Sequence, residues 1–361
     1  MNGELEQREY QLEAVEKVTG FFKAGKESVL LESPVGSGKT VMGLMIVQRL
    51  QEMLGQELRV NWVATRRHIL EQTRQMNEQW FHIPLNTVSV FASDPPKADL
   101  VILDEAHHEA TQSCLNLYEK IQNTHTLGLS ATPMRTDKMR LSFQAHVHTT
   151  TIQKLIDEDV LAAFYSYKLD DWKPESVAKI YCQYKEQWGK SIVFFHTIHE
   201  CERFKEALLN ENIPCEVITS KSNRDEQLEK FMQGAFPVIA NVNIFCEGFD
   251  LPQLQTVFIR DASRLPTIQM AGRGLRKAEN KDHCNFVQSQ LAAYQVEKIA
   301  RPAQSYVHRK NIWLSRSGDT QAISDALAMT EERLRIYEET HPVSDEHKVS
   351  YSGYKKIAVR L

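Results

Sequence analysis

A glycine-rich loop between a strand-like run and a helical segment constrains the fold of this chain most. Residues 28–32 read SVLLE, residues 33–40 read SPVGSGKT, and residues 40–53 have helical spacing. A strand that enters a helix through such a loop presents backbone N–H groups and the positive end of the helix dipole to phosphate oxygens. The alternative is a turn that binds nothing, and the placement of Lys39 and Thr40 at the helix start argues against it.

Short runs of β-forming residues alternate with helical segments, which predicts parallel sheets with helices on both faces. The runs are residues 28–32, 58–65, 87–91, 100–104 and 126–130 in the first half, and 191–195, 215–219, 237–242, 256–261 and 284–287 in the second. The fold class is therefore α/β, with tandem parallel-sheet domains expected over residues 1–155 and 160–290. Residues 151–174 lack a clear strand pattern and are expected to connect the domains. Residues 291–361, with a helix at 322–339, are expected to form a small, mostly helical accessory extension.

The composition is that of an ordinary soluble globular protein, with 42% hydrophobic and 25% charged residues and a net charge of −4. No apolar run approaches the ~20 residues that span a bilayer, and the N-terminus has no signal-peptide pattern, so we expect no membrane association and a cytoplasmic location. The six cysteines are scattered without a CxxC pair, which argues against a zinc site or a disulfide framework. A chain of this charge can bind nucleic acid only through a local basic surface.

A second segment, DEAH at residues 104–107, follows an apolar run. The carboxyl end of a buried strand in a parallel sheet is where ligands bind. There Asp104 and Thr40 would hold Mg²⁺, and Lys39 would reach the β- and γ-phosphates. Glu105 would orient or deprotonate the attacking water, with His107 close to the γ-phosphate. Taken alone, the acidic pair could equally be the N-cap of the next helix.

The segment QMAGRGLR at residues 269–276 places Arg273 and Arg276 three residues apart on an expected helix, where they would share one face. Arginines that cross a cleft can stabilise charge on a γ-phosphate in the transition state. Two arginines on a helix otherwise indicate a solvated face. The motif therefore gains its meaning from the phosphate site upstream.

In this order, segments 33–40, 104–107, 130–132 and 269–276 resemble the motifs of DEAH-type superfamily 2 helicases and translocases. The resemblance covers about residues 8–290 and implies two RecA-like domains with Mg²⁺ and ATP bound between them. The motif sequences at residues 65–73 and 247–252 are most similar to those of the DNA-repair and phage branch of RadD, UvsW and XPB. The compact size would suit a phage-encoded protein. In departure from the family, Ser33 replaces the usual first Gly or Ala. The interval from Lys39 to Asp104 is also short, and residues 91–95 resemble a shortened strand-gripping segment.

The resemblance implies roles for individual residues. The nucleotide would be bound by Gln11, Pro34, Gly36, Ser37, Gly38, Lys39, Thr40, Gly248 and Asp250, with Glu105, Lys39, Arg273 and Arg276 as catalytic residues and Thr40 and Asp104 as metal ligands. Hydrolysis would be coupled to strand contacts by His107, Ser130, Thr132 and Gln269, and the nucleic-acid backbone would be held by Thr65, Arg66, His196 and Thr197. Backbone contacts of this kind are independent of base sequence and sensitive to salt.

The sequence therefore predicts an ATP-dependent nucleic-acid helicase or translocase that acts as a monomer and on DNA in preference to RNA. An RNA helicase is one alternative. Another is the motor subunit of a restriction, repair or replication complex that needs a protein partner. A scaffold with a degenerate ATPase fold is a further class, and the intact Lys39, Asp104 and Glu105 argue against it.

Overall fold

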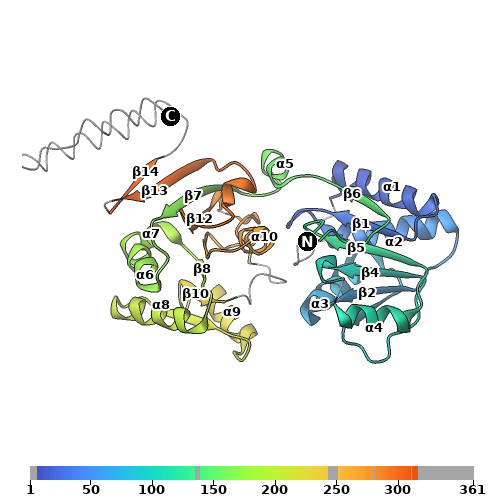
Figure 1. Cartoon of the computed structure of the whole chain (residues 1–361), viewed down its shortest axis with the longest axis horizontal. Coiled ribbons are helices and arrows are strands. Elements are labelled where there is room, and N and C mark those ends of the chain that lie inside the picture. The colour runs from blue at the N-terminus through green and yellow to red at the C-terminus, as the bar shows by residue number, and fades with distance from the viewer. Residues whose placement is uncertain are drawn as a thin grey trace, which may run out of the picture. The chain divides into compact units, whose positions relative to one another are not determined.

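A six-stranded parallel sheet organises the first lobe of the protein (Figure 1). The computed structural model describes residues 6–109, 111–134, 139–242, 251–279, 281–309 and 311–315. The strands are β1 (Ser28–Glu32), β2 (Val60–Ala64), β3 (Leu85–Ser89), β4 (Leu100–Asp104), β5 (His125–Ser130) and β6 (Ala145–His148), in the order β3-β2-β4-β5-β1-β6. This order brings Glu32, Asp104 and Ser130, the last residues of β1, β4 and β5, to the same edge of the sheet.

Helices cover both faces of the first sheet. They are α1 (Glu9–Lys23), α2 (Lys39–Leu54), α3 (Arg67–Met76) and α4 (Gln112–Ile121), with a π-helical turn η1 (Asn77–Phe81) and a 3-10 turn η2 (Ala106–His108). Leu100 and Ile102 of β4 belong to the hydrophobic cluster that contains α1 and α2, whereas Val101 and Leu103 pack in the cluster of α4. The apolar run at 100–103 is uninterrupted because β4 is buried on both faces.

The second sheet has eight strands. Six of them run parallel in the order β7-β12-β11-β8-β10-β9: β7 (Ala163–Leu169), β8 (Ser191–Phe194), β9 (Cys215–Ile218), β10 (Val238–Asn241), β11 (Thr256–Ile259) and β12 (His283–Ser289). The helices of this lobe are α6 (Pro174–Gln183), α7 (Lys185–Trp188), α8 (Ile198–Asn210), α9 (Arg224–Met232) and α10 (Arg264–Gly272). All the strand-like runs of the sequence are strands, which confirms the α/β class.

The segment expected to be a strandless connection contains a strand, and that expectation is wrong. Residues 151–174 hold the short helix α5 (Ile152–Asp157) and then β7, which pairs with β12 along its whole length. β7 was hidden because Ser166 and Lys168 interrupt its apolar residues although both are buried. Lys168 is tolerated there because its Nζ lies 2.8 Å from a carboxylate oxygen of Glu297, and buried charges need such partners.

The chain divides into a first compact unit that ends at Ala303 and a second that starts at Gln304. Where the expected helical extension is described, it is not α-helical. It holds the 3-10 turn η4 (Val296–Lys298) and an antiparallel hairpin, β13 (Gln304–Arg309) and β14 (Ile312–Ser315). The expected helix at 322–339 lies outside the described residues, and the division at residues 155, 160 and 290 stays a prediction. In the described part of the chain, no helix is long and apolar enough to cross a membrane.

Two helical glycines differ in their surroundings and predict opposite effects on stability. In α2, a Cβ on Gly43 would lie 2.6 Å from Cη2 of the buried Trp62, whereas a Cβ on Gly20 in α1 would meet nothing within 4 Å. We expect Gly43→Ala to lower the free energy of unfolding by about 1–3 kcal/mol, because it overpacks the core. Gly20→Ala should raise it by up to about 1 kcal/mol, because alanine favours the helix. Urea unfolding of both variants measures the difference, and equal shifts would contradict the packing argument.

Candidate nucleotide site and nucleic-acid interface

Two glycines in the left-handed region shape residues 33–38, called the phosphate loop below. Gly36 has a φ of 78° and Gly38 a φ of 83°, a conformation that residues with a Cβ rarely adopt. Helix α2 begins directly after Gly38, so its unpaired N–H groups and its dipole face the loop. The local backbone is therefore arranged to hold an anion such as a phosphate.

Ser33, which departs from the family pattern, ties the phosphate loop to its neighbours. Its N–H donates to the Ser130 carbonyl over 2.9 Å, and its Oγ lies 2.7 Å from Thr149 Oγ1 and 2.6 Å from Ser37 Oγ. The Ser37 hydroxyl in turn donates to the Pro34 carbonyl over 2.7 Å. A Gly or Ala at position 33 could not make the hydroxyl contacts, so the departure adds links within the site rather than removing one.

Lys39 folds back over the phosphate loop. Its Nζ donates to the carbonyl oxygens of Ser33 and Pro34, both over 3.3 Å. Phosphate oxygens are stronger acceptors for an ammonium group than neutral carbonyls are. Lys39 is thus held where it can exchange these carbonyls for a phosphate, and Thr40 follows it in the first turn of α2.

Helix α1 braces the phosphate loop with two side chains. Tyr10 Oη and Gln11 Nε2 both donate to the Ser37 carbonyl, over 2.7 and 3.0 Å. Gln11 Oε1 accepts from the Arg8 N–H over 3.0 Å, so both ends of this amide are bonded within the protein. The sequence predicted an adenine contact for Gln11, which stays a prediction, and did not predict this bracing role.

The DEAH segment leaves β4 through a strained turn. Asp104 is 6% exposed, and burial raises its pKa, with the Glu105 carboxylate adding to the rise and the Lys39 ammonium opposing it. Glu105 has a φ of 52°, a conformation that costs about 1–3 kcal/mol in a residue with a Cβ. Its Oε2 lies 3.3 Å from Nδ1 of His107, whose side chain is 1% exposed. Buried, perturbed carboxylates and backbone strain both concentrate at functional sites.

The oxygen donors at this edge of the sheet suit Mg²⁺. Asp104 offers a carboxylate and Thr40 a hydroxyl, and Mg²⁺ in nucleotide sites takes one or two such protein ligands together with phosphate oxygens. Among the described residues, no group of three or more His, Cys, Asp or Glu side chains could hold a metal ion by itself. The donor set therefore fits a metal that arrives with a nucleotide.

The SAT segment lies next to the phosphate loop. Ser130 Oγ accepts from the Thr132 N–H over 3.2 Å, and Thr132 Oγ1 donates to the Met134 carbonyl over 3.1 Å. Ser130 and Thr132 are both buried. Since the Ser130 carbonyl also accepts from Ser33, Ser130 is bonded directly to the loop and Thr132 is connected to the loop through Ser130.

Helix α10 ends before the two arginines of the segment 269–276. Gln269 lies within the helix, Arg273 is its C-cap residue, and Arg276 lies beyond it. The expectation that the arginines share a helix face is therefore wrong. The helix stops because the chain turns at Gly274, where a Cβ would lie 2.2 Å from Sγ of Cys284. Such a close approach admits only glycine.

The segment 269–276, called the arginine segment below, also approaches the phosphate loop. A Cβ on Gly272 would lie 2.4 Å from Cγ2 of Val35, a residue of the loop. Gln269 and Arg273 are 6% and 7% exposed. Segments far apart in the sequence therefore meet around the loop, as a site built from two lobes requires. The predicted nucleotide contacts Gly248 and Asp250 lie outside the described residues.

The predicted nucleic-acid contacts of the first lobe lie where β2 ends. Thr65 follows the strand, and Arg66 is the N-cap residue of α3. Within residues 91–95, which resemble a strand-gripping segment, sequence reasoning did not single out Phe91, which is 70% exposed on the turn after β3. This turn is fixed, since the Val90 N–H donates to the Ala64 carbonyl over 3.0 Å. An exposed aromatic side chain on a rigid turn beside Thr65 is available to stack on a base.

In the second lobe, the predicted contacts His196 and Thr197 follow β8. Thr197 is the N-cap residue of α8 and forms a capping box with Glu200, so it also has a structural role. Arg260, at the end of β11, places Nη1 3.5 Å from His196 Nδ1. Arg260 thus joins the predicted contacts at this edge, although it stands outside any motif that the sequence analysis used.

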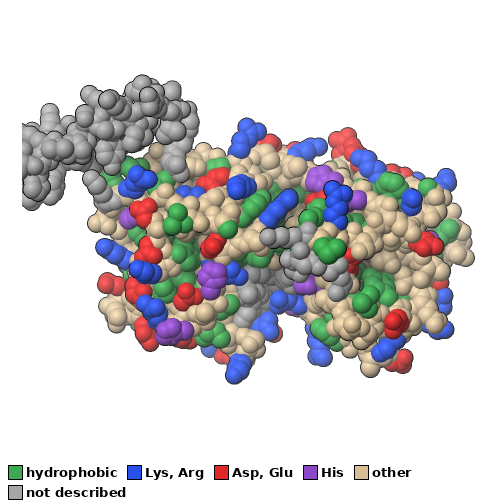
Figure 2. All heavy atoms as spheres, in the orientation of Figure 1, with side chains coloured by type: hydrophobic (Ala, Val, Ile, Leu, Met, Phe, Trp, Pro, Cys, Tyr) green, Lys and Arg blue, Asp and Glu red, His purple; other side chains and the backbone are tan. Residues whose placement is uncertain are grey.

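Other charged residues are paired on the surface. Arg74 of α3 forms ion pairs with Glu71 over 2.6 Å and with Glu78 over 2.5 Å, so it belongs to a solvated helix face. On the side of the molecule in Figure 2, Lys and Arg side chains are interspersed with Asp and Glu. The charge pattern of this side therefore does not mark a broad nucleic-acid surface.

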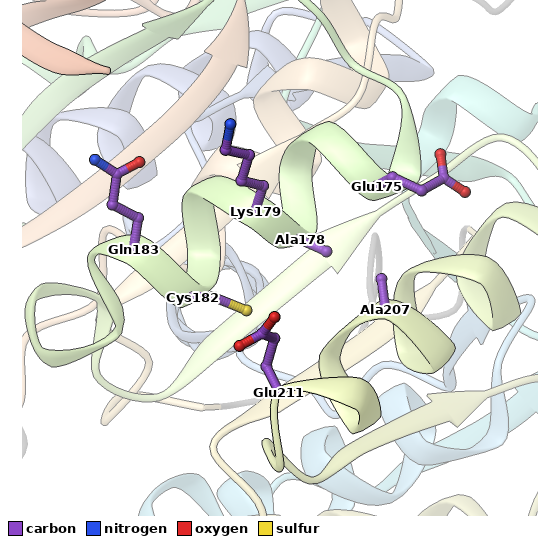
Figure 3. Close-up of a pocket in the computed structure, with 7 residues that line it drawn as sticks. All are labelled: Glu175, Ala178, Lys179, Cys182, Gln183, Ala207 and Glu211. Carbon is purple, nitrogen blue, oxygen red and sulfur yellow. The ribbon is translucent and has the colours of Figure 1, made fainter.

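A hollow of about 520 Å³ lies apart from the phosphate loop, between α6 and α8 of the second lobe (Figure 3). Its lining mixes Glu175, Lys179 and Glu211, and Glu175 is already paired with Arg203 over 2.7 Å. The two carboxylates in the lining would repel a phosphate, so this hollow is not a candidate phosphate site.

Comparison with known protein families gives a match for each of the two lobes. The family described as type III restriction enzyme, res subunit, matches residues 4–95 and 92–135. The helicase conserved C-terminal domain matches residues 172–278. These matches contain the phosphate loop, the DEAH segment and the arginine segment, in the order in which the sequence analysis found them.

Individual proteins agree with this placement. IRC3 of Saccharomyces cerevisiae, an ATP-dependent helicase by name, is 26% identical over 349 residues, which cover 78% of this chain and 51% of IRC3. The DNA-bound structure of the type ISP restriction-modification enzyme LlaBIII matches with a TM-score of 0.61 at 18% identity, over 90% of this chain and 30% of LlaBIII. Dbp5 of S. cerevisiae, solved with RNA, matches with a TM-score of 0.53 at 14% identity, over 81% of this chain and 89% of Dbp5.

The chain spans about half the length of IRC3 and less than a third of LlaBIII. The structural likenesses establish the fold, two RecA-like lobes, and the family matches add the motifs that these lobes carry. The chain therefore has the fold and the motifs of the superfamily 2 helicases.

Proposed function

We propose that the chain is a nucleic-acid-stimulated ATPase that converts the hydrolysis of Mg²⁺–ATP into movement along DNA or remodelling of it. The observation that carries the proposal is the phosphate loop at the start of α2, with buried Asp104 and strained Glu105 at the same edge of the sheet. A degenerate scaffold would gain nothing from keeping a raised pKa and backbone strain at that edge.

In this mechanism the first lobe binds the nucleotide. Lys39 leaves the Ser33 and Pro34 carbonyls for the β- and γ-phosphates, while N–H groups of the phosphate loop donate hydrogen bonds to other phosphate oxygens. Thr40 and Asp104 would hold Mg²⁺, which would supply positive charge against the phosphate oxygens. Glu105 orients or deprotonates the attacking water, and its contact with His107 fixes the carboxylate.

The second lobe completes the site with positive charge. Arg273 and Arg276 stabilise the charge that develops on the γ-phosphate as the bond to the leaving oxygen breaks. Ser130, the last residue of β5, is bonded to the phosphate loop through its carbonyl, and Thr132 is bonded to Ser130. We propose that they transmit the state of the nucleotide to the nucleic-acid contacts.

DNA is the proposed substrate because the structural relative LlaBIII was solved with DNA. The likeness to RNA-bound Dbp5 makes RNA the outcome that would replace it. Contacts at Thr65, Arg66, His196 and Thr197 would be made to the backbone and would weaken with salt. We further propose a monomeric, cytoplasmic protein. Its placement in the RadD, UvsW and XPB branch and its origin in a phage stay predictions.

A second candidate function is that of a motor subunit. The chain covers under a third of LlaBIII, a restriction-modification enzyme by its name. A motor of this kind would hydrolyse ATP alone and would need a replication, repair or restriction partner for a further activity. Strand separation measured with and without such a partner distinguishes the two candidates.

The test is the steady-state ATPase rate with no polymer, single-stranded DNA, duplex DNA, forked DNA or single-stranded RNA. Stimulation by a DNA supports the proposal, and stimulation by RNA alone replaces the substrate. Equal or absent turnover in every sample overturns the motor function of the isolated chain.

Glu105→Gln should retain ATP binding and lose about 10²–10⁴-fold in kcat, because the amide cannot accept a proton from the attacking water. Binding of a fluorescent ATP analogue and phosphate release measure the two effects separately. Glu109→Gln, which changes a nearby carboxylate outside the assigned set, is the matched control. Wild-type turnover by Glu105→Gln would remove Glu105 from the catalytic residues.

Asp104→Asn should make the nucleotide-free protein more stable at pH 7. The folded-state pKa of Asp104 is raised by burial, so its ionised form is disfavoured by folding. This penalty is fully present above the raised pKa and fades as the pH falls below it. The stability gain, measured as Tm, should therefore shrink at pH 5. Mg²⁺–ATP should stabilise the wild type but not Asp104→Asn, and a variant less stable than wild type at pH 7 would contradict the burial argument.

Phe91→Ala should weaken the binding of single-stranded DNA by about 1–3 kcal/mol, the usual value of one stacked base. The unstimulated ATPase should be unchanged, since Phe91 lies away from the phosphate loop. Leu115→Ala, which removes another exposed apolar side chain on α4, serves as the control in the same fluorescence anisotropy titration. Equal losses in both variants would remove the stacking role.

A further inference from the structure

We propose that Lys281 is a positioning residue, whose ammonium group fixes the turn that carries Arg273 and Arg276. Lys281 lies outside all the motifs that the sequence analysis identified. The inference rests on the proposed function, since it assigns Lys281 a part in the same ATPase. It concerns how the arginines are held rather than whether they act.

The ammonium group of Lys281 is buried among backbone carbonyls. Lys281 is 6% exposed, and its Nζ donates to the carbonyls of Gly274 over 2.6 Å, Arg276 over 2.7 Å and Pro252 over 3.2 Å. An ammonium group has three N–H donors and no acceptor. Each donor of Lys281 therefore has a partner, and all the partners belong to segments that the family resemblance assigns to the nucleotide.

The location of these carbonyls explains why a cation is needed. Helix α10 ends at Gly272, so the carbonyls of the turn that follows it have no helical partner, and buried carbonyls need a donor. Lys281 satisfies the carbonyls of Gly274 and Arg276 just beyond that end. The intervening carbonyl, of Leu275, accepts from the Ala162 N–H over 2.8 Å. Three consecutive carbonyls of this turn, residues 273–276, called the arginine turn below, are thus fixed.

Burying an ammonium group costs free energy, which its hydrogen bonds to the carbonyls must offset. Burial lowers the pKa of Lys281, which means that the charged form is disfavoured by its surroundings. Its three acceptors are all neutral carbonyl oxygens rather than carboxylates. An apolar side chain of similar length would fill the space at lower cost. The gain from lysine is therefore the geometry that its N–H groups impose on the turn.

That geometry bears on catalysis because arginines must be placed accurately. A displacement of about 1 Å in a catalytic group can cost up to about 100-fold in rate. The bond to Pro252 also connects the arginine turn to the end of the segment 247–252, to which the family resemblance assigns nucleotide contacts. Lys281 thereby fixes the positions of these two segments of the second lobe relative to each other.

The experiment compares Lys281→Met with Lys168→Met, a matched control. Lys168 is the other buried lysine that the structure describes in this lobe, and its Nζ donates to side-chain oxygens of Gln288 and Gln295 and pairs with Glu297. These three partners lie outside the arginine turn. Lys168→Met leaves the Glu297 carboxylate without its cation, so it should destabilise the fold at least as much as Lys281→Met.

We expect Lys281→Met to lower the DNA-stimulated kcat by about 10–100-fold with an unchanged KM for ATP. Lys168→Met should lower Tm without this loss. In the Arg276→Ala background, Lys281→Met should have little further effect on kcat, because residues that act through one another are not additive. If Lys281→Met does not fold, the same cycle is measured with Lys281→Gln, which retains two N–H donors.

Wild-type kcat in the folded Lys281 variant would overturn the inference, as would an equal loss in Lys168→Met or a full additional loss in the Arg276→Ala background. These outcomes are distinct from failure of the proposed function, in which the wild-type protein itself shows no ATP turnover. They are also distinct from failure of the arginine assignment, in which Arg276→Ala turns over ATP at the wild-type rate.

Discussion

The site depends on one backbone constraint, the left-handed turn at Gly36 and Gly38 between β1 and α2. A chain that turns in this way exposes N–H groups that the sheet and the helix cannot satisfy. The surroundings of the loop are arranged around this deficit. Ser33, Tyr10 and Gln11 fix the loop through its hydroxyl and carbonyl groups, which leaves the N–H groups of Gly36 and Gly38 for an anion. The position of a phosphate is therefore defined by backbone before any charged side chain contributes.

Two buried lysines in the second lobe show how a single residue type serves different ends. Lys168 is bound by side chains, and its carboxylate partner Glu297 connects β7 to the turn η4. Lys281 is bound by backbone carbonyls of the turn that follows α10. The first arrangement compensates one buried charge with another. The second uses a charge to hold the carbonyls of a turn, and the difference decides which of them can influence the arginines.

Much of the fold followed from the sequence because central strands such as β4, β8 and β11 are buried on both faces. Their apolar runs are uninterrupted, and their positions could be predicted within a few residues. β6 was not predicted, because the exposed His146 and His148 alternate with its buried residues. β7 could not be predicted, since Ser166 and Lys168 have buried partners that only the folded chain supplies. The phosphate loop was recognisable because its glycines form a local sequence pattern. The contacts of Tyr10 with the loop and the position of Lys281 could not be predicted, because their partners are brought together only by folding. A lysine with three carbonyl partners has no local pattern that separates it from a lysine in water.

The links of Ser33 have a mechanical consequence. This residue is bonded through its N–H to the end of β5 and through its hydroxyl to Thr149, which follows β6. The phosphate loop is thus clamped to the strands on both sides of β1, and it cannot yield independently of the sheet. The first lobe is stiff at the point where force would be generated. Any conformational change driven by a nucleotide must then occur in other, more flexible segments of the chain.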